Sequence, residues 1–210
     1  MIRTLVFICA LIELSILSAS AQTCAGYGSF DDGSGLVTAS GMFAPHARTF
    51  GATVSGRTNG FIGGGGFSAT KDEDLDIWSS AVSATGGTEV RVGSGNAVFI
   101  CPAGQLEYSF PFTVAGAEVS RLGLAVGGRV GVRFGVARGL ALVPTVGTLL
   151  VHQRQQVDDL TASETGGVAL AGMGLVFNRR YSVVPLFVAP FAFSSSSKQF
   201  SVQLGVNFGR

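Results

Sequence analysis

Hydrophobic and small or polar residues alternate one by one over long parts of this chain. The clearest run is Leu122–Val136, whose even-numbered positions are hydrophobic apart from Gly128. Its odd-numbered positions are Gly or Ala, together with Arg129 and Arg133. A period of two is the pattern of a β-strand with two different faces. The run therefore predicts a strand with one apolar face and one face of small residues and arginine.

The C-terminal stretch repeats this pattern, with Phe200, Val202, Leu204, Val206 and Phe208 on one face and mainly Ser, Gln, Gly and Asn on the other. Small residues fit the crowded interior of a narrow barrel. A continuous apolar face fits lipid, where only a closed sheet satisfies every backbone group. We therefore predict an all-β fold, a closed antiparallel up-and-down transmembrane β-barrel. A secreted soluble β-sandwich is the alternative architecture.

Ten segments carry enough alternation to be strands, most of them close to the roughly 9–11 residues that a tilted membrane strand requires. They are Leu36–Ala44, Arg48–Arg57, Gly60–Lys71, Leu75–Gly86, Ala97–Phe110, Ser120–Ala137, Leu140–His152, Gly167–Phe177, Tyr181–Phe193 and Lys198–Phe208. We predict about ten strands. Eight or twelve stay open, because the connection over 87–96 is too long for a simple turn.

The connections support an orientation with both termini in the periplasm, where turns are short and the outer loops are longer. Tight turns are predicted at Asn59-Gly60, Arg138-Gly139 and Asn178–Arg180, and Asn-Gly is a strong hairpin dipeptide. Outer loops are predicted at Asp72–Asp76, Pro111–Glu118, Gln153–Gly166 and Ser194–Ser197. Aromatic girdles are predicted from Phe43, Phe50, Phe61, Trp78, Tyr108, Phe110, Phe177, Tyr181, Phe193 and Phe208.

The N-terminus has the pattern of an export signal. A basic start is followed by the mostly apolar Leu5–Leu17, and Ala19 and Ala21 form the small-x-small pattern read by signal peptidase. We predict a cleaved signal peptide at 1–21, an N-terminal periplasmic or lumen segment at 22–34 and the barrel at 35–210. The expected location is the cell outer membrane, reached through the periplasm.

Two cysteines, Cys24 and Cys101, remain after removal of that signal. An even pair in an oxidising compartment is a candidate disulfide, and two unrelated thiols are the alternative.

The overall composition excludes several function classes. Charged residues make up only 13% of the chain, the mean hydropathy is +0.45 and Gly accounts for 31 residues. A net charge of +1 and a pI of about 7.8 do not fit a nucleic-acid binder. The His and Cys spacing predicts no zinc site, and no phosphate-binding loop is present. We therefore expect no metal and no cofactor.

The C-terminal residues Gln203, Gly205 and Phe208 resemble the signal read by the outer-membrane barrel assembly machinery. Cys24, Ile100-Cys101-Pro102 and Val206–Arg210 also match the outline of small OmpA/OmpX-like barrels, in particular uncharacterised outer membrane β-barrel domain proteins. This resemblance spans nearly all of 22–210. The resemblance implies the barrel fold and a location in the outer membrane, reached with periplasmic chaperones and the assembly machinery. It implies no particular activity.

Four charged residues are expected to line the lumen: Arg57, Glu107, Arg129 and Arg133. Such side chains fill a small barrel, so we predict a non-catalytic barrel with a structural or surface-interaction role in contact with lipid and lipopolysaccharide. A narrow, porin-like channel with an arginine lining is the first alternative. A rim hydrolase is another, because His46 and His152 are predicted near the outer Asp residues.

Overall fold

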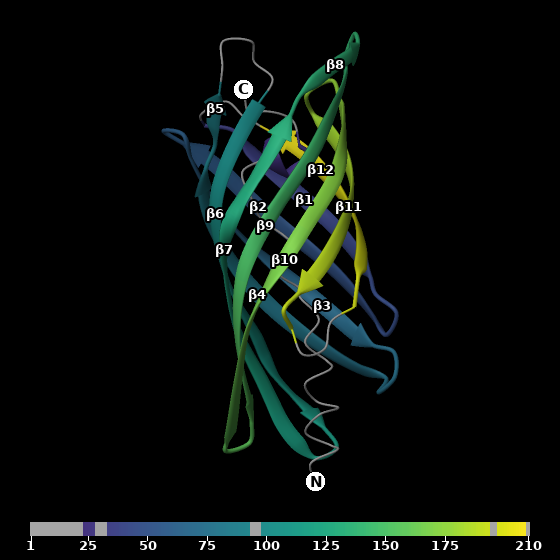
Figure 1. Cartoon of the computed structure of the whole chain (residues 1–210). Coiled ribbons are helices and arrows are strands. Elements are labelled where there is room, and N and C mark those ends of the chain that lie inside the picture. The colour runs from purple at the N-terminus through teal and green to yellow at the C-terminus, as the bar shows by residue number, and fades with distance from the viewer. Residues whose placement is uncertain (1–22, 28–32, 93–97, 194–196, 209–210) are drawn as a thin grey trace.

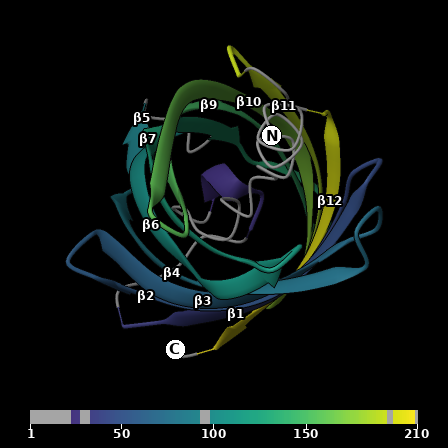
Figure 2. The same ribbon diagram turned by 90° about the horizontal axis from the view of Figure 1, so that it is seen from below.

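A closed, tilted barrel forms the whole described part of the chain (Figures 1 and 2). The structure is a computed structural model, and it describes residues 23–27, 33–92, 98–193 and 197–208. Its elements are η1 (Thr23–Ala25), β1 (Gly35–Phe43), β2 (Ala47–Thr58), β3 (Phe61–Asp72), β4 (Ile77–Thr88), β5 (Val90–Val92), β6 (Val98–Val114), β7 (Ala117–Val132), β8 (Phe134–Ala137), β9 (Leu140–Val157), β10 (Leu160–Phe177), β11 (Tyr181–Phe191) and β12 (Gln199–Phe208).

Ten of these strands close the barrel in sequence order, and β5 and β8 are short additions paired with β6 and β9. All pairings are antiparallel, and the ring is completed where β1 pairs with β12 from Gly35↔Phe208 to Phe43↔Phe200. The prediction of an antiparallel barrel of ten strands is confirmed, and the alternatives of eight and twelve strands are wrong. The soluble sandwich is wrong as well, because the sheet closes on itself.

The outer surface of the barrel is apolar. Exposed side chains along the strands include Phe67, Leu124, Val146, Phe187 and Leu204, each between 44% and 59% exposed. The buried inward positions of β12, β1, β2 and β3 are mostly Thr, Ser and Gln, such as Thr38, Thr53 and Gln203. Apolar residues outside and polar residues inside reverse the arrangement of a soluble protein and match a membrane-spanning barrel. No helix in the described residues is long and apolar enough to cross a membrane.

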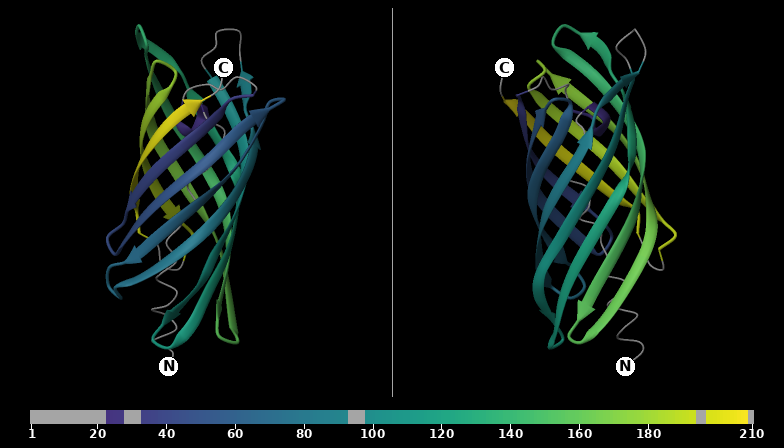
Figure 3. Two further views of the ribbon diagram at one scale, coloured as in Figure 1. Left: turned by 180° about the vertical axis from the view of Figure 1, so that it is seen from behind. Right: turned by 90° about the vertical axis from the view of Figure 1, so that its left-hand side faces the viewer.

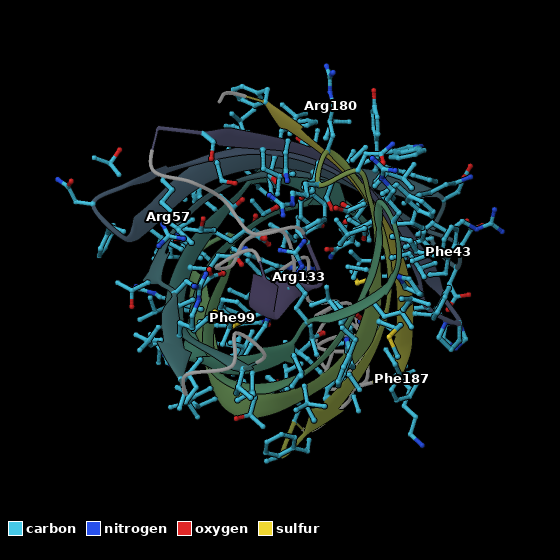
Figure 4. All side chains as sticks on the ribbon, turned by 90° about the horizontal axis from the view of Figure 1, so that it is seen from above. Phe43, Arg57, Phe99, Arg133, Arg180 and Phe187 are labelled. Atoms are coloured by element: carbon cyan, nitrogen blue, oxygen red, sulfur yellow. A yellow bond between two sulfur atoms is a disulfide. The ribbon has the colours of Figure 1, made fainter. Side chains whose placement is uncertain are left out.

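Aromatic rings are exposed toward the strand ends, as the girdle prediction requires. Nine of the ten predicted rings are exposed: Phe43, Phe50, Phe61, Trp78, Tyr108, Phe110, Phe177, Tyr181 and Phe208. In Figure 4, Phe43 and Phe187 point away from the barrel wall. Phe193 is the exception, because it packs against the buried cluster of Val151, Val168 and Val188.

Four strands are much longer than the rest. β6, β7, β9 and β10 have 16 to 18 residues, against nine to 12 in the other closing strands. They remain paired almost to their tips, with Val114↔Ala117 and Val157↔Leu160 at the two turns. They project beyond the other strands at one end, as Figures 1 and 3 show. We call this part the extension (residues 110–120 and 153–166), that end of the barrel the extension end, and the opposite end the turn end.

The extension corrects two predicted loops. Pro111–Glu118 and Gln153–Gly166 are strand, apart from tight turns at Ala115-Gly116 and Asp158-Asp159. At Ala115 and Gly116 φ is 50° and 87°, and at Asn59 and Gly60 it is 50° and 76°. Positive φ at both central residues is the requirement of a type I′ hairpin turn.

The turn end departs from the predicted segments in two places. The segment Ser120–Ala137 is not one strand, because β7 ends at Val132 and β8 begins at Phe134, with Arg133 between them. The long connection over 87–96 contains β5, which pairs with β6 from Val90↔Ile100 to Val92↔Val98. Both short strands lengthen hairpins at the turn end without changing the count of the closing strands.

Candidate functional site: the plugged lumen

A short N-terminal segment lies inside the barrel rather than below it. Cys24 in η1 is bonded to Cys101 on the inward face of β6, across a sequence separation of 77 residues, and both are fully buried. The candidate disulfide is confirmed. We call Cys24–Tyr27 the plug; the purple η1 ribbon in Figure 2 shows its place within the ring of strands. The predicted signal peptide and its cleavage residues Ala19 and Ala21 lie outside the described residues.

The barrel wall is shaped to receive the plug. The Tyr27 hydroxyl donates a hydrogen bond to Gln203 Oε1 on β12 at 2.5 Å. A Cβ on Gly174 of β10 would lie 1.8 Å from the Gly26 carbonyl oxygen, and one on Gly205 would lie 2.9 Å from the Tyr27 ring. A side chain would clash at both positions, so glycine allows the Gly26 backbone and the Tyr27 ring to approach the wall closely.

The sequence identified some of these residues for other reasons and missed others. Gln203 and Gly205 were predicted as part of an assembly signal, whereas their side-chain positions face the lumen and contact Tyr27. Phe208 is half exposed on the outer face of β12. Tyr27, Gly26 and Gly174 carry no sequence motif. The only clue was an aromatic residue in a glycine-rich stretch directly after Cys24.

The cavities that the described residues line in the lumen are small. Two cavities of about 30 Å³ lie toward the extension end, and one of about 10 Å³ lies beside Cys101. Each of these spaces holds one or a few water molecules or a small ion.

The lumen wall has two chemically different sides. The inward positions of β9, β10 and β11 are largely aliphatic, and the buried ones include Val143, Val151, Val168, Leu170, Val176, Val184, Leu186 and Val188. The inward positions from β12 round to β7 are mostly Thr, Ser, Gln, Gly and Ala. They also include the charged residues Arg57, Glu107, Arg121 and Arg129 and the buried apolar residues Leu36, Met42, Ile62 and Phe99. Sequence alternation alone did not reveal this difference, because both faces of β11 are apolar.

The four predicted lumen residues do not form one network. Arg57 lies at the turn end, where its Nη1 is 3.4 Å from Glu89 Oε1. Glu107 lines a cavity with Arg121 and Gln153 nearer the extension end. Arg129 is 4% exposed beside the disulfide, since its pairing partner on β6 is Cys101. Figure 4 shows Arg133 at the mouth of the lumen and Arg180 pointing outward from the rim.

The charges at the turn end are mainly positive. Arg133 lies close to Arg91 and Arg179, and partial burial together with their repulsion lowers the pKa of its guanidinium. At the extension end the Lys71 ammonium lies 2.8 Å from Asp76 Oδ1, and this hydrogen bond lowers the pKa of the Asp76 carboxyl. Asp76 is fully exposed, so this pair is a surface contact of small energetic weight.

The two rim histidines are held in different ways. His46 Nδ1 lies 3.0 Å from Asp74 Oδ2 in an exposed pair. His152 instead contacts Thr165 Oγ1 at 2.8 Å and pairs with no carboxylate among the described residues. Within the described part of the chain, no three His, Cys, Asp or Glu side chains gather as metal ligands.

Fold and lumen together define a membrane-spanning β-barrel of the outer-membrane type. Its backbone resembles an outer membrane channel of Pseudomonas putida, with a TM-score of 0.51, 9% identity, and coverage of 87% of this chain and 98% of that one. The β domain of the Bordetella autotransporter BrkA gives a TM-score of 0.49 at 11% identity, covering 85% of this chain and 99% of that one. The translocator domain of NalP from Neisseria meningitidis gives a TM-score of 0.47 at 13% identity, covering 88% of this chain and 91% of that one. At such identities the likeness shows the fold alone. No protein-family model matches the sequence, and no curated protein does.

Proposed function

We propose that the protein is an outer-membrane barrel with a closed lumen, whose extension contacts partners outside the cell. The observation that carries this proposal is the pairing of four long strands beyond a barrel in whose lumen the plug is covalently fixed. Under this proposal the turn end faces the periplasm and the extension end faces outward.

The extension is built as one rigid unit. β7 pairs with β9 up to Val119↔Val157, which joins the two hairpins side by side. At the tips the Asp158 N–H donates to the Glu118 carbonyl oxygen at 2.9 Å, and the Glu118 N–H donates to Asp158 Oδ1 at 2.9 Å. A sheet held in this way presents a fixed surface, which lowers the entropy lost on binding.

The two edges of the extension suit recognition of an extended polypeptide. β6 pairs with β4 only up to Ser109, and β10 pairs with β11 only from Gly167. Within the described residues, the outer parts of these strands therefore have a strand neighbour on one side only. Such an edge presents free N–H and C=O groups to which another strand can add. Thr161, Ser163 and Glu164 on this part of β10 keep it polar.

The alternatives have weaker support. A channel requires a continuous path, whereas the plug is covalently fixed in the lumen and the cavities lined by the described residues hold only a few water molecules. A rim hydrolase requires a base oriented beside a nucleophile. His46 and Asp74 form an exposed pair at 3.0 Å, and Thr165, the residue that contacts His152, lies on the outer surface of β10.

The same proposal includes the remaining partners. Lipid and lipopolysaccharide would surround the exposed apolar belt. The outer-membrane assembly machinery and periplasmic chaperones would deliver the chain, with Gln203, Gly205 and Phe208 of β12 in the assembly signal. The exposed ring of Phe208 on the terminal strand supports this part.

Shortening the extension should abolish adhesion and leave the barrel intact. The variant replaces residues 110–120 and 154–163 each by Asn-Gly, so that the paired residues Ser109↔Arg121 and Gln153↔Glu164 flank new two-residue turns. We expect the folded band to keep its shift on heating in gels. Cells that express the variant should lose aggregation and binding to surfaces coated with extracellular-matrix protein.

The matched control replaces only Ala115-Gly116 and Asp158-Asp159 by Asn-Gly, which keeps the length of the extension. It should adhere like the wild type. If the shortened variant adheres as well as the wild type, and the wild type conducts ions in planar bilayers, the channel is favoured instead.

A further inference from the structure

Arg129 is a buried cation without a matching anion among the described residues. Its side chain lies on the inward face of β7, opposite Cys101 on β6 and Gly147 on β9, and the residue is 4% exposed. Its Nε makes no hydrogen bond, and among the described residues no carboxylate pairs with the guanidinium. A buried charge in this state is strongly unfavourable, so proteins provide a countercharge.

Tyr27 of the plug does not provide this charge, although it interacts electrostatically with Arg129. Its hydroxyl donates a hydrogen bond to Gln203 Oε1 at 2.5 Å, which is the hydrogen bond of a neutral phenol. No countercharge for Arg129 is therefore found among the described residues of the plug and the barrel wall.

A second unused donor points to the same place. Gln105 on β6 is 6% exposed, and its Nε2 has no hydrogen-bond partner. Arg129 and Gln105 line one cavity of about 10 Å³, whose other lining residues are Cys101, Ala103, Gly104, Ala125, Gly128 and Leu149. This lining contains no acidic group, so its two N–H donors face only small and apolar neighbours.

We infer that Arg129 and Gln105 bind a small inorganic monovalent anion of the chloride type in this cavity. A water molecule would satisfy the N–H groups but would leave the positive charge without compensation. The cavity volume is near that of one water-sized sphere, which excludes sugars, nucleotides and other large anions. The disulfide forms part of the cavity wall, so a bound anion stabilises the wall where the plug is attached.

The site is tested with halides on the folded, disulfide-bonded barrel. The temperature at which the folded gel band disappears should rise with sodium chloride, and saturate, when sodium gluconate keeps the ionic strength constant. Arg129→Met should remove this dependence completely, and Gln105→Leu should reduce it. Crystals grown in sodium bromide should show an anomalous peak between the Arg129 guanidinium and the Gln105 amide.

Arg154→Met is the matched control, because Arg154 is an exposed arginine of the extension and its variant should keep the full chloride dependence. Equal unfolding temperatures in chloride and gluconate, or an unchanged chloride dependence in Arg129→Met, would overturn the inference. The absence of an anomalous peak in this cavity in wild-type crystals grown in bromide would also overturn it. This test does not depend on whether Arg129→Met folds. None of these outcomes depends on what the extension binds.

Discussion

Replacing both Cys24 and Cys101 by serine should lower the unfolding temperature of the barrel and open its lumen to ions. The bond closes a loop across 77 residues, for which the loop-closure estimate of stabilisation is roughly 4.5 kcal/mol. Without the bond, the plug is held mainly by the Tyr27–Gln203 hydrogen bond and by its packing, and one such bond contributes only about 1 kcal/mol. The measurements are the midpoint temperature of the gel shift and single-channel currents in planar bilayers.

Two controls separate loss of the bond from loss of the plug's other contacts. Wild-type protein treated with a reductant should behave like the double variant. Tyr27→Phe retains the disulfide and removes one hydrogen bond. It should therefore carry no current in bilayers and lose far less stability than the double cysteine variant. A double variant that melts like the wild type and carries no current would show that packing alone retains the plug.

The fold was predictable from sequence because lipid and lumen impose opposite demands on adjacent residues. Val126 faces lipid and is 47% exposed, whereas its neighbour Ala125 faces the lumen and is 1% exposed. This contrast repeats along the spanning part of every closing strand from β1 to β7 and in β12, so alternation gave the strand number and most boundaries within two or three residues. Asn59-Gly60 set its hairpin for a local reason, since both residues tolerate positive φ.

The extension was missed because its strands leave the bilayer. On β9 the outward residues change from Leu150 to His152, Arg154 and Gln156. Outside lipid, a strand needs no apolar face, and its polar residues look like those of a loop. Only the pairing with β7, from Leu124↔His152 to Val119↔Val157, keeps this part extended.

The interior of the lumen was harder to predict for a different reason. Which inward residues meet depends on the shear of the barrel and on where the plug lies, and neither leaves a local pattern. Alternation placed Arg129 and Arg133 on one face four residues apart, yet one is buried beside Cys101 and the other lies at the mouth of the lumen. Arg57 was expected only as one of the lumen residues, and its pairing with Glu89 at the turn end was not predicted.

Val146→Arg should destabilise the barrel by about 2–4 kcal/mol, the cost of placing an arginine on the lipid face near the middle of the bilayer. Val146 is 59% exposed and lies midway along the outward row of β9 from Leu142 to Leu150, which is apolar apart from Thr148. Its side chain has no lumen partner to lose, so the cost comes from lipid alone. The measurement is urea unfolding in phospholipid vesicles, followed by the fluorescence of Trp78, the only tryptophan of the chain.

Gln156→Arg is the matched control, because it adds the same side chain on the same strand and the same face, but in the extension. Its effect should stay within about 0.5 kcal/mol, as for other exposed surface positions. A similar loss of unfolding free energy for Val146→Arg and Gln156→Arg would contradict a membrane boundary between Leu150 and His152. A large cost at position 146 alone would place the lipid belt around the closed part of the barrel and leave the extension in water, where it is free to meet a partner.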